Sequence, residues 1–463
     1  MLETGLGTER RRRLALAVLC AQTLMIVLDQ TIVNVALPSI RDDLGFSQAG
    51  LAWVVNAYLI AFGGLLLLTG RLGDLAGRRR VFLAGMTLFT VASLLCGLAW
   101  NSGILIAARF LQGIGGAASS AVVLSMIVGL FPEARARAKA IGAFSFVQAA
   151  GGSIGSVAGG VLTEAVSWHW IFLINLPIGI VAGLAALRVL DADKGLGLRA
   201  GADVLGAALV TVALMLGVYA IVEMDGARSV LLGALSLVLL AAFLLRQART
   251  ANPLLPLRLF ASRTLSGANV VQLLLVSAAF GFQFLVVLYL RQVLGFSAEQ
   301  TGLAMLPVAV VIAVVSLAVS ARVTHRFGER AVLLTGLVLM AGGLALLARI
   351  PVDGYYVLDL LPAMLVLGFG FGLAMPALMA LGMSDARPED TGLASGLFNT
   401  TQQVGGALGL STLAVLAATR GGSLEALTSG YRLAFWVAAG LVATGAVVAV
   451  FVFAPRRGGA TRA

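Results

Sequence analysis

The sequence predicts an all-α integral membrane protein in which two six-helix bundles are joined by two further helices, giving fourteen membrane-spanning helices. Three observations lead to this prediction. The 463 residues are 60% hydrophobic and 11% charged, with a mean hydropathy of +1.00, and a surface of this composition cannot be kept hydrated. Long apolar runs alternate with short basic loops. The two ends of the chain also share sequence patterns in the same order.

The apolar runs set the number of expected helices, because a helix needs about 20 mostly apolar residues to cross a bilayer. Fourteen runs meet this length, and the eighth is the shortest. Their approximate cores are residues 14–37, 51–69, 81–99, 104–130, 138–163, 170–187, 204–222, 230–245, 265–290, 302–320, 331–348, 357–381, 393–418 and 433–453. The first run continues past Asp29 to Pro38 without a small-residue cleavage site, so we interpret it as a retained span and not as a signal peptide.

The distribution of Lys and Arg predicts the orientation in the membrane, since all connecting loops are short. With a cytoplasmic N-terminus, one of the 32 basic residues lies within a span and 25 lie on the cytoplasmic side. The six in outer loops are Arg41, Arg228, Arg291, Arg349, Arg420 and Arg432. An even number of spans returns the C-terminus to the cytoplasm. We therefore expect a multi-pass protein of the cytoplasmic membrane, surrounded by lipid, with both termini inside.

Several classes of function are disfavoured by what the sequence lacks. The net charge of +11 is spread over loops and does not follow one face, so no nucleic-acid partner is expected. Neither Lys139 nor Lys194 is followed by Ser or Thr, which excludes a P-loop. The two histidines and two cysteines have no metal-binding spacing. We expect no cofactor, no metal and no enzymatic activity, and an intramembrane enzyme is the weaker alternative.

An internal repeat is the basis for the two-bundle prediction. The pattern Gly45-Phe46-Ser47 recurs as Gly295-Phe296-Ser297, and Arg71 with Gly77 matches Arg322 with Gly328. Further along the two halves, one more set of pairs keeps a constant offset: Phe144, Gln148, Gly151, Gly152 and Gly155 match Phe398, Gln402, Gly405, Gly406 and Gly409. Three collinear matches indicate a duplication of six helices.

The position of the two extra spans makes this repeat parallel, because an even number of helices then separates equivalent ones. Parallel repeats place a transporter's substrate site between the halves, near the bilayer midplane. The expected domains are 1–190 for the N-terminal bundle, 191–262 for the linker with two extra helices, 263–455 for the C-terminal bundle and 456–463 for a cytoplasmic tail. We expect a monomer.

Several motifs resemble those of the major facilitator superfamily, and specifically its fourteen-helix drug:proton antiporter branch. GRLGDLAGRRR at residues 70–80 resembles the superfamily's loop signature between helices two and three. LDQTIVNVALP at 28–38 resembles the first-helix signature of that branch, and WHWIFLINLP at 168–177 its fifth-to-sixth connection. The fourth-helix pattern is matched by Leu105, Arg109, Gln112, Gly113, Gly115 and Gly116. The resemblance covers nearly the whole chain.

The resemblance implies a proton-coupled exporter of drugs, antibiotics or other amphipathic small molecules that works by alternating access. Its partners would be the small-molecule substrate and protons. A proton-coupled uptake symporter is an alternative within transport. A non-transporting membrane sensor on the same scaffold is the alternative outside it.

Asp29 is the acidic residue that lies deep in a predicted span, where an isolated carboxylate costs about 2.5 to 3.5 kcal/mol. At about 1.5 Å per residue, Asp29 lies about 13 Å inside Pro38, and Arg109 enters to a comparable depth from the same side. The resemblance implies that Asp29 carries the coupled proton; a structural, hydrogen-bonded acid is the alternative. Arg109 is either the cation that modulates Asp29 or a brace to backbone carbonyls. Gln112 shares its helix face with Arg109.

Glycines Gly151, Gly155 and Gly159 form a strip at four-residue spacing, which allows a second helix to approach closely. The strip resembles the family's antiporter signature, except that Ser156 replaces the usual proline. Simple helix packing is an equally open interpretation.

Polar and aromatic residues in the spans are candidates for the substrate cavity, although such residues also join helices to one another. The candidates are Gln30, Asn34, Tyr58, Gln112, Gln283, Phe284, Asn399 and Gln402.

The loop at residues 70–80 is the candidate conformational gate, with Gly70, Asp74, Gly77 and Arg78 as its members. The resemblance implies that Asp74 sits against the start of the eleventh helix, near residues 329–332. Arg78 would pair with Glu133 and stabilise an outward-open state. The second copy has His325 in place of the acid, so we expect a one-sided lock. The simpler interpretation is a charged loop that anchors the cytoplasmic face.

Overall fold

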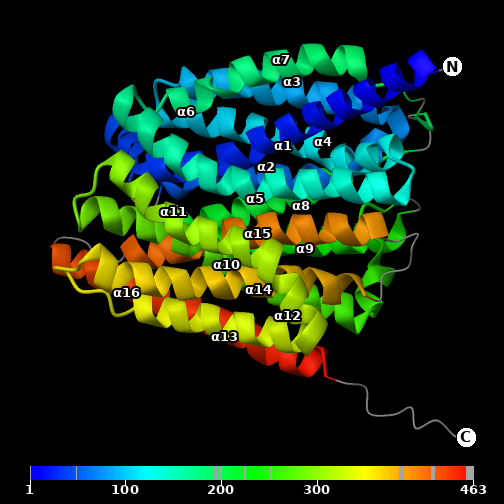
Figure 1. The fold of residues 1–463 in the computed structure, drawn as a ribbon. Coiled ribbons are helices and arrows are strands. Elements are labelled where there is room, and N and C mark those ends of the chain that lie inside the picture. The colour runs from blue at the N-terminus through cyan, green and yellow to red at the C-terminus, as the bar shows by residue number, and fades with distance from the viewer. Residues whose placement is uncertain are drawn as a thin grey trace, which may run out of the picture.

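The computed structural model describes residues 2–47, 50–191, 193, 195–197, 201–223, 226–250, 253–384, 391–418 and 423–454. The predicted tail 456–463 lies outside these ranges. Within them the chain is helical, without strands, and its long helices run side by side (Figure 1). Helix α1 begins and helix α16 ends at the same end of the bundle, which we call the termini end. The opposite end, where α1 ends and α2 begins, is the first-loop end.

The helices form two halves and a linker pair, as predicted. The N-terminal half contains α1 (Leu2–Leu44), α2 (Ala52–Ala76), α3 (Arg78–Gly97), α4 (Ser102–Leu130), α5 (Ala134–Ala165), α6 (Trp170–Leu173) and α7 (Asn175–Val189). The linker contains α8 (Val204–Glu223), α9 (Gly226–Arg249) and the short η2 (Leu257–Ala261). The C-terminal half contains α10 (Arg263–Gln292), α11 (Ala298–Val314), η3 (Val315–Val319), α12 (Ser320–Phe327), α13 (Glu329–Leu347), η4 (Tyr356–Leu360), α14 (Leu361–Met383), α15 (Thr391–Ala418) and α16 (Leu424–Val452).

Twelve helices in the described part of the chain are long and apolar enough to cross a membrane. Several combine consecutive pieces, such as α6 with α7 over Trp170–Val189 and α11 through α12 over Ala298–Phe327. Helices α5 and α15 are not among these twelve, but they are 32 and 28 residues long. At about 1.5 Å per residue, both are long enough to cross the hydrocarbon core. The helices are therefore consistent with the fourteen predicted spans.

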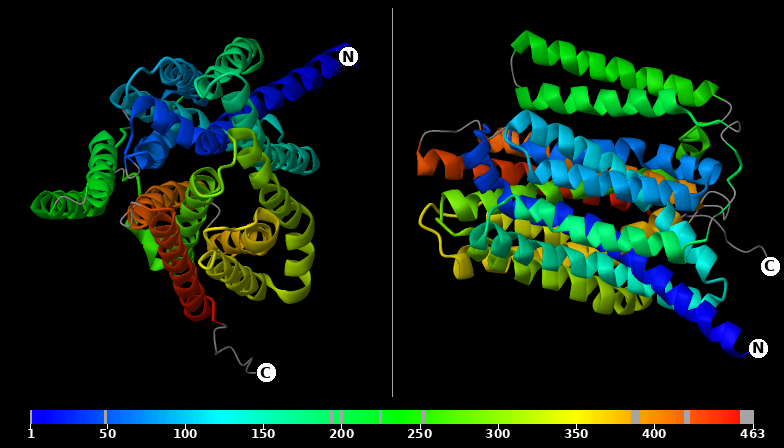
Figure 2. Two further views of the ribbon diagram at one scale, coloured as in Figure 1. Left: turned by 90° about the vertical axis from the view of Figure 1, so that its left-hand side faces the viewer. Right: turned by 90° about the horizontal axis from the view of Figure 1, so that it is seen from above.

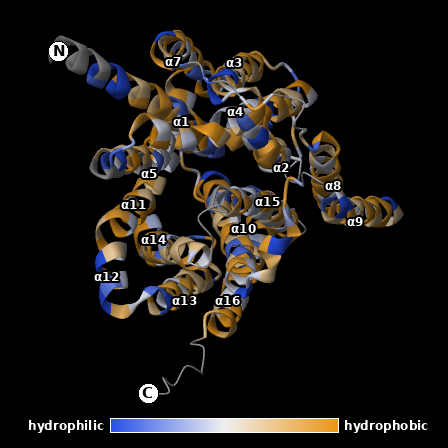
Figure 3. Cartoon of the chain, turned by 90° about the vertical axis from the view of Figure 1, so that its right-hand side faces the viewer, coloured by the Kyte–Doolittle hydropathy of each residue, from blue (hydrophilic) through white to orange (hydrophobic). Residues whose placement is uncertain are grey.

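The two linker helices pack as a hairpin on the flank of the molecule, beside α2 (Figure 3). The hydroxyl of Ser236 on α9 donates to the carbonyl of Ala213 on α8 at 2.7 Å. The rings of Tyr219 on α8 and Trp53 on α2 lie 6.1 Å apart. The eighth apolar run, the shortest in the sequence, is thus part of a 24-residue helix.

The repeat is visible in the backbone of equivalent turns. Gly77 ends α2 with φ of 98°, and its counterpart Gly328 ends α12 with φ of 80°. Side chains other than glycine rarely adopt such positive φ angles, so both turns require glycine to reverse the chain between antiparallel helices. The sequence match of these two glycines therefore reflects the same helix-turn-helix geometry in each half.

The two halves meet along two pairs of helices, α5 with α11 and α2 with α15 (Figure 2). Asn56 on α2 donates to the hydroxyl of Ser411 on α15 at 2.7 Å. Near the first-loop end, the carboxylate of Glu164 on α5 accepts from the backbone N–H of Ala298, the first residue of α11, at 3.0 Å. These contacts hold the halves together at the first-loop end.

Candidate functional site

Asp29 and Arg109 form an ion pair in the interior of the N-terminal half. The Arg109 Nη1 atom lies 2.5 Å from Asp29 Oδ2, and the two side chains are 1% and 0% exposed. Gln112 Nε2 donates to the other carboxylate oxygen at 2.7 Å. The structure therefore brings together Asp29, Arg109 and Gln112, as their predicted depths in the membrane and shared helix face had indicated.

Arg109 also reaches the backbone of a neighbouring helix. Its Nε donates to the carbonyl of Val54 on α2 at 2.9 Å, and its guanidinium carbon lies 4.5 Å from the centre of the Tyr58 ring. The centre of the Phe172 ring lies 5.7 Å from the same carbon. Both roles left open by the sequence, the cation beside Asp29 and the brace to a carbonyl, are thus present in the geometry.

Small residues on α4 make this arrangement possible. A Cβ atom on Gly113 would lie 2.9 Å from Ala61 on α2, and one on Gly115 would lie 2.8 Å from the Phe89 Cα on α3. Because α4 lacks side chains at these points, α2 and α3 pack directly against it. Arg109 and Gln112, on the same helix, are thereby surrounded by protein on all sides.

Two further polar residues, which were not among the predicted site residues, complete the cluster. Asn175 Nδ2 lies 3.5 Å from Asp29 Oδ1 and donates to Ser93 Oγ at 3.0 Å, and Gln112 Nε2 also approaches that hydroxyl at 3.2 Å. Ser93 in turn donates to the carbonyl of Phe172 at 2.9 Å. Asn175 carries an amide within an apolar span, and this feature of the sequence could have indicated that it belongs to the site.

The cluster has a clear energetic consequence. A buried ion pair is tolerated when its lone pairs and protons are hydrogen-bonded, and removing one partner typically costs about 3 to 5 kcal/mol. Neutralising Asp29 by protonation would remove the attraction that holds Arg109 and Gln112 in place. Neutralising Asp29 would therefore leave Arg109 as a buried cation without its counter-charge.

The predicted cavity residues are spread over both halves. Tyr58 and Phe284 are fully buried, and Asn34 is buried with its amide donating to the Gln30 carbonyl at 2.8 Å. Gln30, Gln283 and Gln402 are half-buried, whereas Asn399 is exposed. Gln112 belongs to the Asp29 cluster. The assignment of these residues to a substrate cavity stays a prediction.

The candidate gate at residues 70–80 makes its ion pair within the loop itself. Arg78 pairs with Asp74, one turn away, with 3.4 Å between Nη2 and Oδ1, and both side chains are exposed. Helix α13, whose start was predicted to meet Asp74, packs on α14 and α16. The predicted contacts of Asp74 with α13 and of Arg78 with Glu133, which the resemblance assigned to an outward-open state, stay predictions. In this structure, by contrast, the halves are joined at the first-loop end.

The linker contributes an unpredicted contact to this gate. The carboxylate of Asp193 accepts from the backbone N–H groups of Arg78 at 2.7 Å and Arg79 at 3.1 Å, which are the first two residues of α3. Burial acts to raise the pKa of Asp193, but these backbone hydrogen bonds outweigh it and lower the pKa below its ordinary value. The backbone N–H of Leu196 also donates to the Asp74 carbonyl at 2.9 Å. The segment after α7 thus covers the turn between α2 and α3.

The glycine strip of α5 lies against α1. A Cβ atom on Gly151 would be 3.0 Å from Val27, one on Gly155 would be 3.1 Å from the Leu28 carbonyl oxygen, and one on Gly159 would be 2.7 Å from the Ile32 carbonyl oxygen. Neighbouring Gly160 instead faces α11, where a Cβ atom would lie 2.6 Å from the Ala298 carbonyl. Helix α5 runs without interruption, and the Ser156 hydroxyl donates to the Gly152 carbonyl at 3.2 Å.

Residues 19–410 match the family model described as Major Facilitator Superfamily. The chain belongs to this superfamily. Relatives in the superfamily include the puromycin resistance protein pur8 of Streptomyces alboniger, which is 38% identical over 96% of this chain and 92% of its own length. The cephamycin export protein CmcT of Amycolatopsis lactamdurans is also 38% identical, over 91% of this chain and 88% of its own.

Solved structures of other transporters share the fold at low sequence identity. The POT family transporter PepTSo superposes with a TM-score of 0.72, at 15% identity, covering 96% of this chain and 97% of that one. A bacterial homologue of the human lysosomal transporter Spinster gives a TM-score of 0.69 at 15% identity, with the same coverage. Membership of the superfamily makes the chain a multi-pass membrane transporter of small molecules and not an enzyme.

Proposed function

We propose that this protein is a proton-coupled antiporter that exports antibiotics or other amphipathic small molecules across the cytoplasmic membrane by alternating access. Two of its relatives are named for puromycin resistance and cephamycin export, which supports export as the direction and an antibiotic-like compound as the substrate. The proposal includes a monomer with both termini in the cytoplasm, which places the first-loop end outside.

The observation that carries the proton-coupling proposal is the buried Asp29–Arg109 pair. A carboxylate with no exposed surface, placed within a membrane span, is a functional candidate by default. Its partners come from α4 and α7, so a proton on Asp29 alters contacts among several helices.

The proposed cycle follows from these contacts. In the described state the halves are joined at the first-loop end, and Asp29 is paired with Arg109. Protonation of Asp29 releases Arg109 and Gln112, which favours a rearrangement of the N-terminal half against the C-terminal half. A ligand or proton shifts such an equilibrium by its difference in affinity for the two states. Substrate would bind between the halves, and its departure to the outside would be coupled to protonation of Asp29.

The direct test uses everted membrane vesicles containing the wild type, Asp29→Asn, or the control Asp353→Asn, which alters an exposed acid in a loop. We expect substrate-driven proton release in the wild type and in the control, and none in Asp29→Asn. Undiminished proton release in Asp29→Asn would remove Asp29 from the coupling mechanism.

Two alternatives are separated by whole-cell measurements. Collapse of the proton gradient raises substrate accumulation in cells if the protein exports, and lowers it if the protein is an uptake symporter. A sensor is favoured if deletion of the protein changes neither drug susceptibility nor secretion of metabolites. A resistance panel in an efflux-deficient host identifies the compound class.

A further inference from the structure

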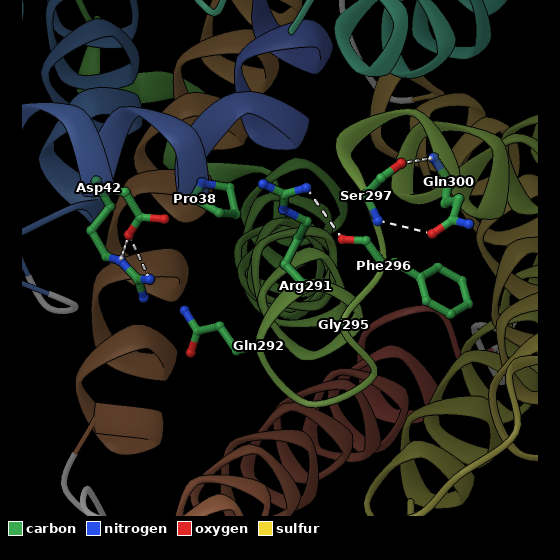
Figure 4. Close-up of a pocket in the computed structure, with 9 residues that line it drawn as sticks. Pro38, Asp42, Arg291, Gln292, Gly295, Phe296, Ser297 and Gln300 are labelled. Atoms are coloured by element: carbon green, nitrogen blue, oxygen red, sulfur yellow. Dashed lines mark hydrogen bonds and ion pairs between the residues drawn. The ribbon is translucent and has the colours of Figure 1, made fainter. Parts of the chain in front are cut away.

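A polar pocket lies between the two halves at the first-loop end, and none of its lining residues belongs to the Asp29 cluster (Figure 4). Its volume is about 620 Å³, within the range of small-molecule sites. The N-terminal half contributes Pro38, Arg41 and Asp42 at the end of α1. The C-terminal half contributes the end of α10, the start of α11 and the loop between them. The pocket therefore exists only while the halves are together at this end.

The residues that line the pocket carry more positive than negative charge. Arg41 and Arg291 supply two cations, and Asp42 supplies the one carboxylate among the residues that line the pocket. Arg41 is already paired with Asp42, at 3.0 Å from Nε and 2.8 Å from Nη2. This leaves the guanidinium of Arg291 as the net positive charge.

Arg291 has neutral partners in the described structure. Its Nη1 donates to the carbonyl of Phe296 at 3.2 Å, and its Nη2 lies 3.4 Å from the hydroxyl of Ser39 on α1. Figure 4 shows the guanidinium next to Pro38, on the pocket side of α10. A guanidinium offers five N–H donors in a planar fork that matches a carboxylate or phosphate. Both of its long contacts leave donor capacity for such a group.

The neighbouring groups favour an acceptor as well. The amide nitrogen of Gln292 is buried without a hydrogen-bond partner, while the amide oxygen of the same side chain accepts from Tyr431. The backbone and side chain of Ser297 and Gln300 satisfy one another in a capping box. The Gln292 amide nitrogen therefore adds an unpaired donor beside the Arg291 guanidinium.

We propose that this pocket binds an anionic group, a phosphate or a carboxylate, with the Arg291 guanidinium as its principal ligand. Because the walls come from both halves, the bound anion stabilises the state in which the first-loop end is closed. The same chemistry is offered by a free anion and by the headgroup of an anionic lipid. The inference does not depend on the substrate or on proton coupling.

The experiment uses the full chain in nanodiscs of phosphatidylcholine, with thermal unfolding as the readout at constant ionic strength. One arm adds inorganic phosphate against chloride, and the other replaces part of the lipid by phosphatidylglycerol. We expect a saturable rise in unfolding temperature in at least one arm. A response to phosphate indicates a free-anion site, and a response to phosphatidylglycerol alone indicates a lipid headgroup site.

Three variants make the test specific. Arg291→Gln should weaken the apparent affinity about 10-fold or more, as expected for a lost charge-assisted hydrogen bond. Gln300→Glu adds a negative charge to the pocket but keeps the capping box, since Glu serves equally at that position, and it should also weaken binding. The control Arg349→Gln removes an exposed arginine that follows α13 at the same end, and it should bind as the wild type does.

Gln300→Glu also serves as the second test of the pocket if Arg291→Gln does not fold. The proposal is overturned if neither anion raises the unfolding temperature of the wild type. It is equally overturned if the folded pocket variants respond as strongly as Arg349→Gln.

Discussion

At the scale of single residues, the Asp29–Arg109 pair combines a structural and a chemical role. Both charged side chains are buried, and each makes a hydrogen bond in addition to the ion pair. Asp29 accepts from Gln112, and Arg109 donates to the Val54 carbonyl. Either residue alone would be an uncompensated charge in a low-dielectric interior. The pair is therefore expected to be strongly coupled in stability as well as in function.

This coupling is measurable by a double-mutant cycle. We expect Arg109→Gln to destabilise the protein by about 3 kcal/mol or more, because it leaves the Asp29 carboxylate buried without a cation. Adding Asp29→Asn should recover part of the loss, giving an interaction energy of at least about 1 kcal/mol. The measurement is unfolding of all four proteins in one detergent. Additive losses would show that the two residues stabilise the fold independently.

At the scale of elements, α5 is the helix that contacts both α1 in its own half and α11 in the other. Its glycines allow each neighbour to come close to its backbone. A side chain at Gly155, Gly159 or Gly160 would meet a backbone carbonyl oxygen of the neighbouring helix. A packing role follows from this geometry whatever the helix does during transport.

We expect Gly155→Leu to lower stability by about 1 to 3 kcal/mol, the usual range for overpacking a filled interior. The control is Gly142→Leu on the same helix, where a Cβ atom would meet no atom within 4 Å. Thermal unfolding in detergent and expression level are the measurements. Because Leu has a higher helix propensity than Gly, the Gly142→Leu control should be neutral or slightly stabilised. An equal loss of stability in both variants would contradict close packing at Gly155 as the cause.

At the scale of the whole molecule, the structure shows a carboxylate at the start of a helix in the other half, but at the end opposite to the predicted gate. Glu164 of α5 accepts from the first backbone N–H of α11, where the helix dipole favours a negative charge. The equivalent contact predicted from the sequence is that of Asp74 at the cytoplasmic end. Two such locks, each engaged in a different state, would be a physical basis for alternating access.

We expect Glu164→Ala to shift the protein towards a state open at the first-loop end. The lost interaction is worth about 1 kcal/mol, or roughly a fivefold change in the ratio of states. Spin labels at residues 100 and 353, in a variant without Cys20 and Cys96, report the distance between halves. Glu425→Ala, which removes an exposed acid from the first turn of α16, is the control. An unchanged distance distribution in Glu164→Ala would contradict the role of Glu164 as a lock.

Much of the architecture was predictable because the membrane imposes strict rules on the sequence. Spans must be long and apolar, so the pieces α11 to α12 and α6 to α7 were each expected as one crossing. The repeat was predictable because turns such as those at Gly77 and Gly328 require glycine. The depth of Asp29 and Arg109 along their helices indicated that they could meet, since rise per residue is fixed.

The sequence by itself determined the membrane class, the repeat and the family, since these depend on composition, periodicity and local turn chemistry. Only the tertiary structure decided which polar groups meet. Helix rotation and contacts between distant segments decide which residues become neighbours. They place Ser93 and Asn175 beside Asp29, the Asp193 carboxylate at the start of α3, and Arg291 in a pocket shared with α1. A helix of mostly apolar residues carries little information about its rotation, because nearly every face can be placed against lipid or protein.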